Sequence, residues 1–92
     1  MPDITTFIRN WIKRIKYHDN LNTIQEVVEL GLCADLATIL WEKYPNTTVH
    51  SNDHCIHTWI ESNGKHYDMQ NPKGVKNWKK LRYFKDCKTC SK

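Results

Sequence analysis

Three residues of the chain, Cys33, His57 and Asp68, have the types and the order that cysteine-based acyl transfer needs. A thiol attacks a carbonyl as its thiolate, so a nearby base must take its proton, and a carboxylate on the other ring nitrogen fixes the tautomer of that base. Cys33 follows Gly31 at the start of an apolar-periodic segment. A helix N-terminus there favours the thiolate and offers a backbone N–H to a developing oxyanion. We therefore interpret the three residues as nucleophile, general base and orienting acid.

The approach of His57 to Asp68 depends on a β-hairpin predicted around Asn63-Gly64. Asn-Gly between two runs of β-formers is a strong hairpin signal, because both turn residues need positive φ. The predicted pairs are Ser62–Lys65, Ile60–Tyr67, Trp59–Asp68 and His57–Gln70. Since side chains alternate along a strand, one face is expected to carry His57, Trp59, Glu61, His66, Asp68 and Gln70. His57 and Asp68 are then diagonal neighbours on that face.

The rest of the pattern predicts an α+β domain in which N-terminal helices pack on a small antiparallel β-sheet. Apolar residues at helical spacing predict a helix over 3–17, and a Thr23–Glu26 capping box starts a short helix that Gly31 ends. A third helix is expected over 33–43, before Pro45. A short strand at 47–49, a turn at 71–74, a further strand at 81–84 and a polar tail from residue 85 complete the prediction.

Composition fits one folded domain over residues 1–92. The chain is 39% hydrophobic with four Trp and four Tyr, which is typical of a folded protein and enough for one modest core. No apolar run approaches the roughly 20 residues that span a membrane. Arg9, Lys13 and Arg14 interrupt the N-terminal segment, which is unlike a signal peptide, so we expect a cytoplasmic protein. The net charge of +4 is modest, and a solvated basic face is favoured over nucleic-acid binding.

Three motifs in order resemble the core of transglutaminase-like, papain-fold cysteine enzymes. They are Gly31-x-Cys33-x-Asp35-x-Ala37, His57-x-Trp59-Ile60-Glu61 and Gly64-Lys65-His66-Tyr67-Asp68. The resemblance spans residues 31 to 70, and residues 71–75 and 78–84 are also similar to small bacterial and phage-encoded members. It implies a minimal papain/transglutaminase-like core in which Cys33 is the nucleophile, His57 the general base and Asp68 its orienting acid.

The activity that this resemblance implies is acyl transfer through a thioester at Cys33, without a cofactor or a metal. Hydrolysis of a peptide or protein amide is our first expectation, and transfer to an amine is the variant. Met69-Gln70 stands after the aspartate where transglutaminases commonly have a small polar pair, which leaves the acceptor open. Trp11 and Gln25 are candidates, by residue type, for a second oxyanion donor.

The main alternative is a non-enzymatic module, with or without a structural zinc ion, that binds a protein or nucleic acid. Cys87-x-x-Cys90 has the spacing of zinc ligands. The residues that could complete a tetrahedral site are Cys55 with His54, His57 or His50. A single CxxC pair is a weak signal, and free thiols or a disulfide on oxidation are the simpler interpretation of the pair.

Overall fold

A computed structural model of the chain describes residues 3–52 and 57–86 and has an α+β fold. Its elements, in chain order, are α1 (Ile4–His18), α2 (Ile24–Glu29), α3 (Cys33–Lys43), β1 (Thr47–Asn52), β2 (His57–Ser62), β3 (Lys65–Asp68), β4 (Asn71–Val75), the 3₁₀ helix η1 (Trp78–Lys80) and α4 (Arg82–Asp86). Among the described residues, no helix is both long and apolar enough to cross a membrane.

The first three helices begin and end close to where the sequence predicts. Asp3 caps α1, since its Oδ1 accepts the Thr6 backbone N–H at 2.7 Å. The Thr23–Glu26 capping box that starts α2 is present in both directions, and Gly31 follows that helix with a φ of 73°. Short local signals at helix ends therefore fix the chain up to the start of α3.

The four strands form an antiparallel sheet in the order β1-β2-β3-β4. Asn63 and Gly64 both have positive φ, and the β2–β3 ladder has the predicted register: Ile60–Tyr67, Glu61–His66 and Ser62–Lys65. Over the described residues the ladder stops there, so the predicted pairs Trp59–Asp68 and His57–Gln70 do not form. The reason is a tight turn at the end of β3, where Asp68 Oδ1 accepts the backbone N–H groups of Gln70 and Asn71.

Two predictions for the segment after the hairpin are wrong. Residues 71–74 belong to strand β4 rather than a turn, because the chain has already turned at Asp68 and Pro72 is tolerated in an edge strand. Residues 82–86 form helix α4 rather than a strand. Leu81 and Phe84 are both buried, and their spacing of three suits a helical turn packed on the sheet. Lys85 and Asp86 of the expected tail thus belong to α4.

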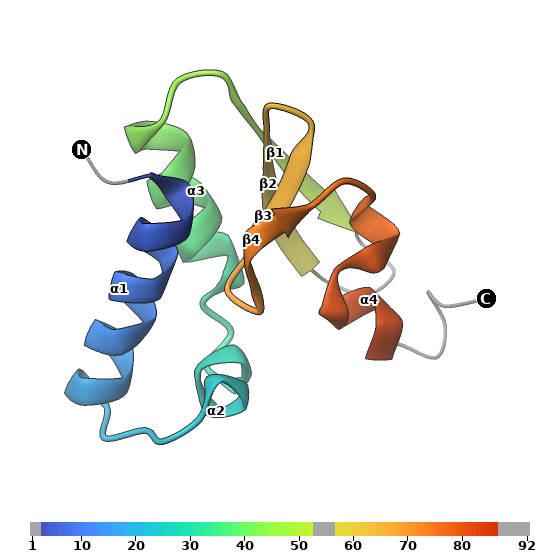
Figure 1. The fold of residues 1–92 in the computed structure, drawn as a ribbon. Coiled ribbons are helices and arrows are strands. Elements are labelled where there is room, and N and C mark those ends of the chain that lie inside the picture. The colour runs from blue at the N-terminus through green and yellow to red at the C-terminus, as the bar shows by residue number, and fades with distance from the viewer. Residues whose placement is uncertain (1–2, 53–56, 87–92) are drawn as a thin grey trace.

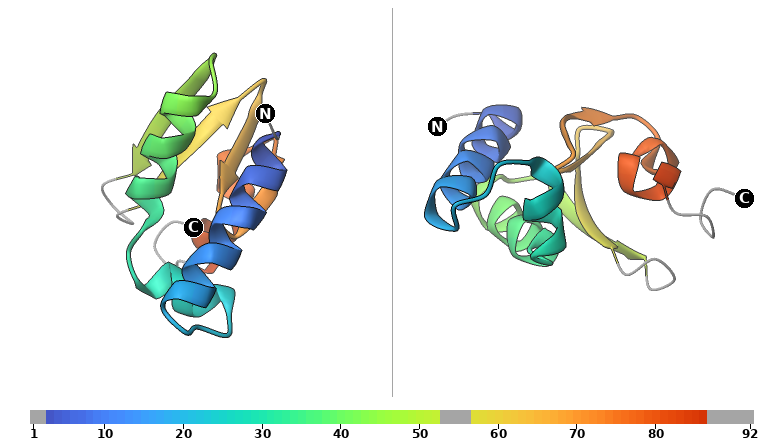
Figure 2. Two further views of the ribbon diagram at one scale, coloured as in Figure 1. Left: turned by 90° about the vertical axis from the view of Figure 1, so that its left-hand side faces the viewer. Right: turned by 90° about the horizontal axis from the view of Figure 1, so that it is seen from below.

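The sheet separates two unequal layers (Figures 1 and 2). Helices α1, α2 and α3 cover one face, and their main core cluster includes Ile8, Leu36 and Leu40 with Ile60 and Met69 of the hairpin region. The 3₁₀ helix and α4 cover the other face, where Leu81 and Phe84 pack on Trp59. The sheet therefore has an α3 face and an α4 face, and the site is built from residues on both.

Candidate active site

A buried imidazole–carboxylate pair lies on the α4 face of the sheet. His57 Nε2 is 2.9 Å from Asp68 Oδ2, and the two residues are only 3% and 4% exposed. His57 is the first residue of β2 and Asp68 the last of β3, so the register set by Asn63-Gly64 brings their side chains together. The predicted approach of these two side chains is confirmed.

The other oxygen of the Asp68 carboxylate is held by the turn that follows it. Oδ1 accepts the backbone N–H of Gln70 at 3.1 Å, the backbone N–H of Asn71 at 2.8 Å and the side-chain Nδ2 of Asn71 at 3.1 Å. A carboxylate with this many donors stays in one orientation. Asp68 is therefore a fixed acceptor that holds the ring of His57.

This pairing leaves the second nitrogen of His57 as a proton acceptor. Since Nε2 donates its hydrogen to the carboxylate, the neutral ring carries its free lone pair on Nδ1. Nδ1 is buried and has no hydrogen-bond partner among the described residues. A buried acceptor without a partner costs roughly 1–3 kcal/mol and calls for an explanation. A role as a general base would explain the unpaired Nδ1, because a base must keep this nitrogen free for the proton donor.

Aromatic side chains enclose the imidazole. The ring of Tyr83 is stacked on it with a centroid distance of 4.1 Å and an interplanar angle of 10°, and Phe84 meets it edge-on at 5.5 Å. Trp59, two residues along β2, also lies beside it. The sequence pattern does not predict Tyr83 and Phe84 at this site, because it favours a strand over residues 81–84. The Leu81–Phe84 spacing was the available signal.

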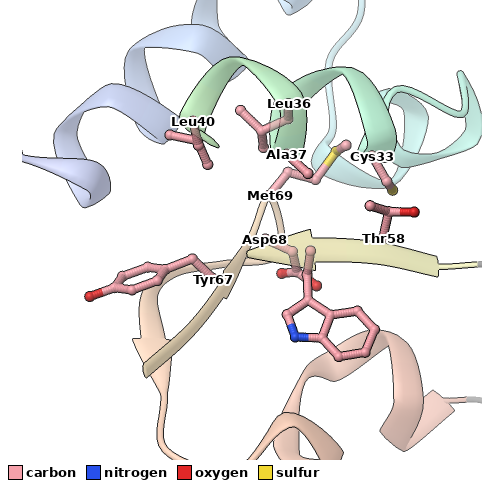
Figure 3. Close-up of a pocket in the computed structure, with 9 residues that line it drawn as sticks. Cys33, Leu36, Ala37, Leu40, Thr58, Tyr67, Asp68 and Met69 are labelled. Carbon is pink, nitrogen blue, oxygen red and sulfur yellow. The ribbon is translucent and has the colours of Figure 1, made fainter. Parts of the chain in front are cut away.

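Cys33 lies at the N-terminus of α3, on the other face of the sheet. It is partly buried and lines a narrow space between α3 and the hairpin, too tight for a water molecule, with Thr58, Asp68 and Met69 (Figure 3). The figure shows its sulfur directed toward Thr58 of β2. Thr58 follows His57 directly, so the thiol lies over the same end of β2 that carries the imidazole on its opposite face.

The lowering of the Cys33 pKa that the helix start is expected to bring is outweighed in this arrangement. Burial raises the pKa of the thiol above its ordinary value, and the negative charge of Asp68 raises it further. The hydrogen bond of the Cys33 backbone N–H lowers the pKa, but by less. Desolvation of the thiolate therefore outweighs the helix start, and Cys33 rests as a neutral thiol.

The structure thus joins His57 to Asp68 and places Cys33 in a pocket with Asp68, but it has no hydrogen bond between Cys33 and His57. Nδ1 of His57 has no partner among the described residues, and His57 does not line the pocket around the thiol. Gln70, expected on the His57 face, instead lines a separate pocket beside α1. The catalytic role of the three residues stays a prediction.

His50, Glu61 and His66 form a second polar group on the α4 face, with one possible ligand atom from each lying within 4.8 Å of the others. His50 Nε2 is 2.8 Å from Glu61 Oε1, and Trp59 Nε1 donates to His66 Nδ1 at 2.9 Å. That donor places the proton of neutral His66 on Nε2. A metal ion on Nε2 needs the opposite tautomer, so the Trp59 hydrogen bond opposes metal binding here.

The other sequence-based candidates lie elsewhere. Trp11 packs against the main core cluster and Gln25 is exposed on α2, and neither lines the pocket around Cys33. Cys87, Cys90, Cys55 and His54, the residues of the zinc hypothesis, lie outside the described residues. Comparison with protein-family models, with curated proteins and with solved structures finds no match to this chain.

Proposed function

We propose that the protein is a cysteine-dependent acyl-transfer enzyme that hydrolyses a peptide or protein amide through a thioester at Cys33. One observation carries the proposal. His57 Nε2 is 2.9 Å from Asp68 Oδ2, in position to donate to it, while Nδ1 is buried and has no hydrogen-bond partner among the described residues. This is the state required of a general base whose orientation a carboxylate fixes.

In the proposed reaction His57 Nδ1 takes the proton of the Cys33 thiol, and the sulfur attacks the amide carbonyl carbon. The tetrahedral intermediate collapses to a thioester as the C–N bond breaks, and His57 gives its proton to the leaving amine. Water then adds to the thioester with His57 again as base. The C–S bond breaks, the acid leaves and the Cys33 thiol is restored.

The start of α3 offers donors for the oxyanion. Leu32, the N-cap residue, makes no side-chain capping hydrogen bond. The regular helical hydrogen bonds of α3 begin with the N–H of Leu36, which donates to the carbonyl of Leu32. The N–H groups of Cys33, Ala34 and Asp35 thus precede the regular helical bonding pattern. A carbonyl attacked by Cys33 would lie beside these donors, where they stabilise negative charge.

The reaction also requires a contact that this structure does not have. Cys33 Sγ must come within hydrogen-bond distance of His57 Nδ1 before the proton can move. Because the two side chains lie on opposite faces of the sheet, this contact has to form past the start of β2. Separated from the imidazole, the buried thiol has a raised pKa. An imidazolium within about 4–6 Å would lower it by roughly 1–3 units. The two arrangements therefore differ in the pH at which Cys33 reacts.

Alkylation with iodoacetamide, followed by mass mapping of the labelled cysteine, tests this proposal. We expect Cys33 to be labelled at a pH below the range of an ordinary thiol, and the half-maximal pH to rise by at least about one unit in His57→Ala. His18→Ala is the matched control, because the side chain of His18 is 87% exposed and remote from the dyad. Equal pH profiles for Cys33 in the wild type and His57→Ala would refute the proposal.

The same samples distinguish the alternative class of function. A zinc-stabilised binding module predicts about one metal ion per chain and unfolding when a chelator is added. The acyl-transfer proposal predicts that a chelator leaves both the labelling profile and the fold unchanged. Unfolding on chelation, with the increased alkylation of the cysteines that unfolding brings, would favour the module.

A further inference from the structure

A second pocket, separate from the space around Cys33, lies between α1 and β4. It has a volume of about 280 Å³ and is lined by Arg9 of α1, by Gln70, and by Asn71, Pro72, Lys73 and Gly74 of β4. This volume is near the lower end of the roughly 300–1,000 Å³ typical of small-molecule sites. The proposed acyl transfer does not use this pocket.

The charged groups of the pocket are both positive. Arg9 and Lys73 come from elements that are far apart in the sequence and packed together in the fold, and no acidic residue lines the pocket among the described residues. Neither cation has a carboxylate within 4 Å in the described part of the chain. Hydrogen bonds from Thr6 are the main cause that lowers the pKa of Asp3, and the charge of Arg9 lowers this pKa as well, although the two side chains form no ion pair.

The wall opposite Arg9 is rigid and carries amide groups. The Asp68 carboxylate holds Gln70 and Asn71 through three hydrogen bonds, so this turn is fixed before any ligand arrives. The side-chain amide of Gln70 can donate hydrogen bonds, and Asn71 Nδ2, which gives one hydrogen to Asp68, has a second to donate. A guanidinium, an ammonium and amide donors around one pocket suit an anion with several oxygens.

We propose that the pocket between α1 and β4 binds a phosphate-bearing ligand, held by Arg9 and Lys73 against the amides of the Asp68–Asn71 turn. Two cations balance the charge of about −1.5 to −2 that a phosphate monoester carries at pH 7. A single carboxylate leaves one cation uncompensated. The proposal is independent of catalysis at Cys33.

Amide NMR with inorganic phosphate as the probe tests the site at constant ionic strength, which removes general screening. We expect saturable shifts of the Gln70, Asn71 and Gly74 amide signals, and weaker, non-saturating shifts with acetate at the same concentration. Arg9→Gln and Lys73→Gln should each weaken phosphate binding by about tenfold or more. Arg14→Gln and Lys65→Gln, exposed cations on α1 and β3 outside the pocket lining, should leave it unchanged.

Three outcomes overturn the proposal: shifts that stay linear in phosphate, shifts that Arg14→Gln reduces as much as Arg9→Gln, or tighter binding of acetate than of phosphate. Arg9 and Lys73 are exposed, and their substitution removes no core contact. The amide spectrum of each variant before titration shows that the fold is kept. Cys33 labelling should be the same in Arg9→Gln and the wild type, which separates failure of this site from failure of the proposed enzyme.

Discussion

The two faces of the β-sheet use buried side chains in different ways. On the α3 face, Ile60 and Met69 pack with the apolar residues of α1, α2 and α3, and burial alone holds the layers together. On the α4 face, His57, Asp68 and His66 are buried beside Trp59 and Phe84, and specific hydrogen bonds fix their positions. Strand alternation puts both kinds of residue in one six-residue strand, β2.

This difference separates stability from chemistry. A buried imidazole or carboxylate is tolerated only with a partner, so the α4 face needs matched donors and acceptors. Cys33 packs on the α3 face, whereas its proposed partner in catalysis, His57, lies on the α4 face. We therefore expect core truncations on the two faces to change the free energy of unfolding independently, and the pH dependence of stability to come from the α4 face.

The largest effect is expected from truncation on the α3 face. Leu36→Ala should lower the free energy of unfolding by about 2–5 kcal/mol, because Leu36 is 2% exposed and its loss leaves a cavity. Phe84→Leu on the α4 face should cost about 1–2 kcal/mol. Urea unfolding of the double variant should give the sum within about 0.5 kcal/mol, since the clusters lie on opposite faces. A coupling above about 1 kcal/mol would show that the faces form one cooperative core.

The next largest effect is expected at the carboxylate. Asp68→Ala leaves the Nε2 donor of His57 and three donors of the turn without their acceptor, and should cost about 3 kcal/mol. Asp68→Asn keeps an oxygen for the turn and should cost less. Its amide donates toward His57 Nε2, which moves the ring proton to Nδ1 and removes the proposed base.

Urea unfolding measures the stability of the Asp68 variants, and the pH profile of Cys33 alkylation measures the state of the proposed base. Asp68→Asn should be closer to the wild type in stability and should raise the half-maximal pH of alkylation by less than His57→Ala does, because loss of the Asp68 charge lowers the pKa of Cys33. Asp35→Asn, at an exposed position on α3, is the matched control and should change stability by less than about 0.5 kcal/mol. A wild-type alkylation profile in Asp68→Asn would mean that the carboxylate serves only the turn.

An intermediate effect is expected where the hairpin meets β4. Gly74 has a φ of 81°, and a Cβ there would lie 2.8 Å from Cε1 of the Tyr67 ring. Gly74→Ala should cost about 2 kcal/mol from backbone strain and the clash together. Gly64→Ala, with a φ of 80° and open space, isolates the strain at about 1 kcal/mol. Equal unfolding free energies for the two variants would mean that Tyr67 moves aside freely.

Local signals account for the parts of the fold that the sequence predicts. The Thr23–Glu26 capping box and the Asn63-Gly64 turn each act within four residues, and the register that places His57 beside Asp68 follows from the second. Helix α4 depends on contacts with Trp59, which is distant in the sequence, and strand β4 depends on its pairing with β3 across the turn that Asp68 holds. Propensity in 71–75 and 81–84 does not report those contacts.

The same distinction applies to the candidate site. The dyad follows from alternation and register, so it is readable in the sequence. The raised pKa of Cys33 depends on how deeply the thiol is buried and on its distance from Asp68, which are properties of packing between α3 and the hairpin. Helix position alone predicts the opposite direction. The enclosure of His57 by Tyr83 likewise depends on where α4 docks.

The smallest expected effect is the pH dependence of stability that His66 gives to the α4 face. Burial lowers the pKa of His66, the charge of His50 lowers it further, and Glu61 opposes both. Its neutral form also accepts the Trp59 N–H at 2.9 Å. Because the pKa of His66 is lower in the folded state, its contribution to stability is fully present at pH values above its pKa in the unfolded state, near 6.5. This contribution is lost as the pH falls through the pKa of the folded state.

His66→Asn keeps an acceptor as many bonds from the backbone as Nδ1 and does not titrate. The stability advantage of the wild type over this variant should therefore shrink between about pH 7.5 and pH 5, measured by urea unfolding at each pH. The indole N–H signal of Trp59 should stay downfield in the variant, because the amide oxygen replaces Nδ1. His18→Asn, exposed on α1, should show no such trend. An advantage that grows on acidification would mean that Glu61 outweighs burial and that His66 is held as the cation.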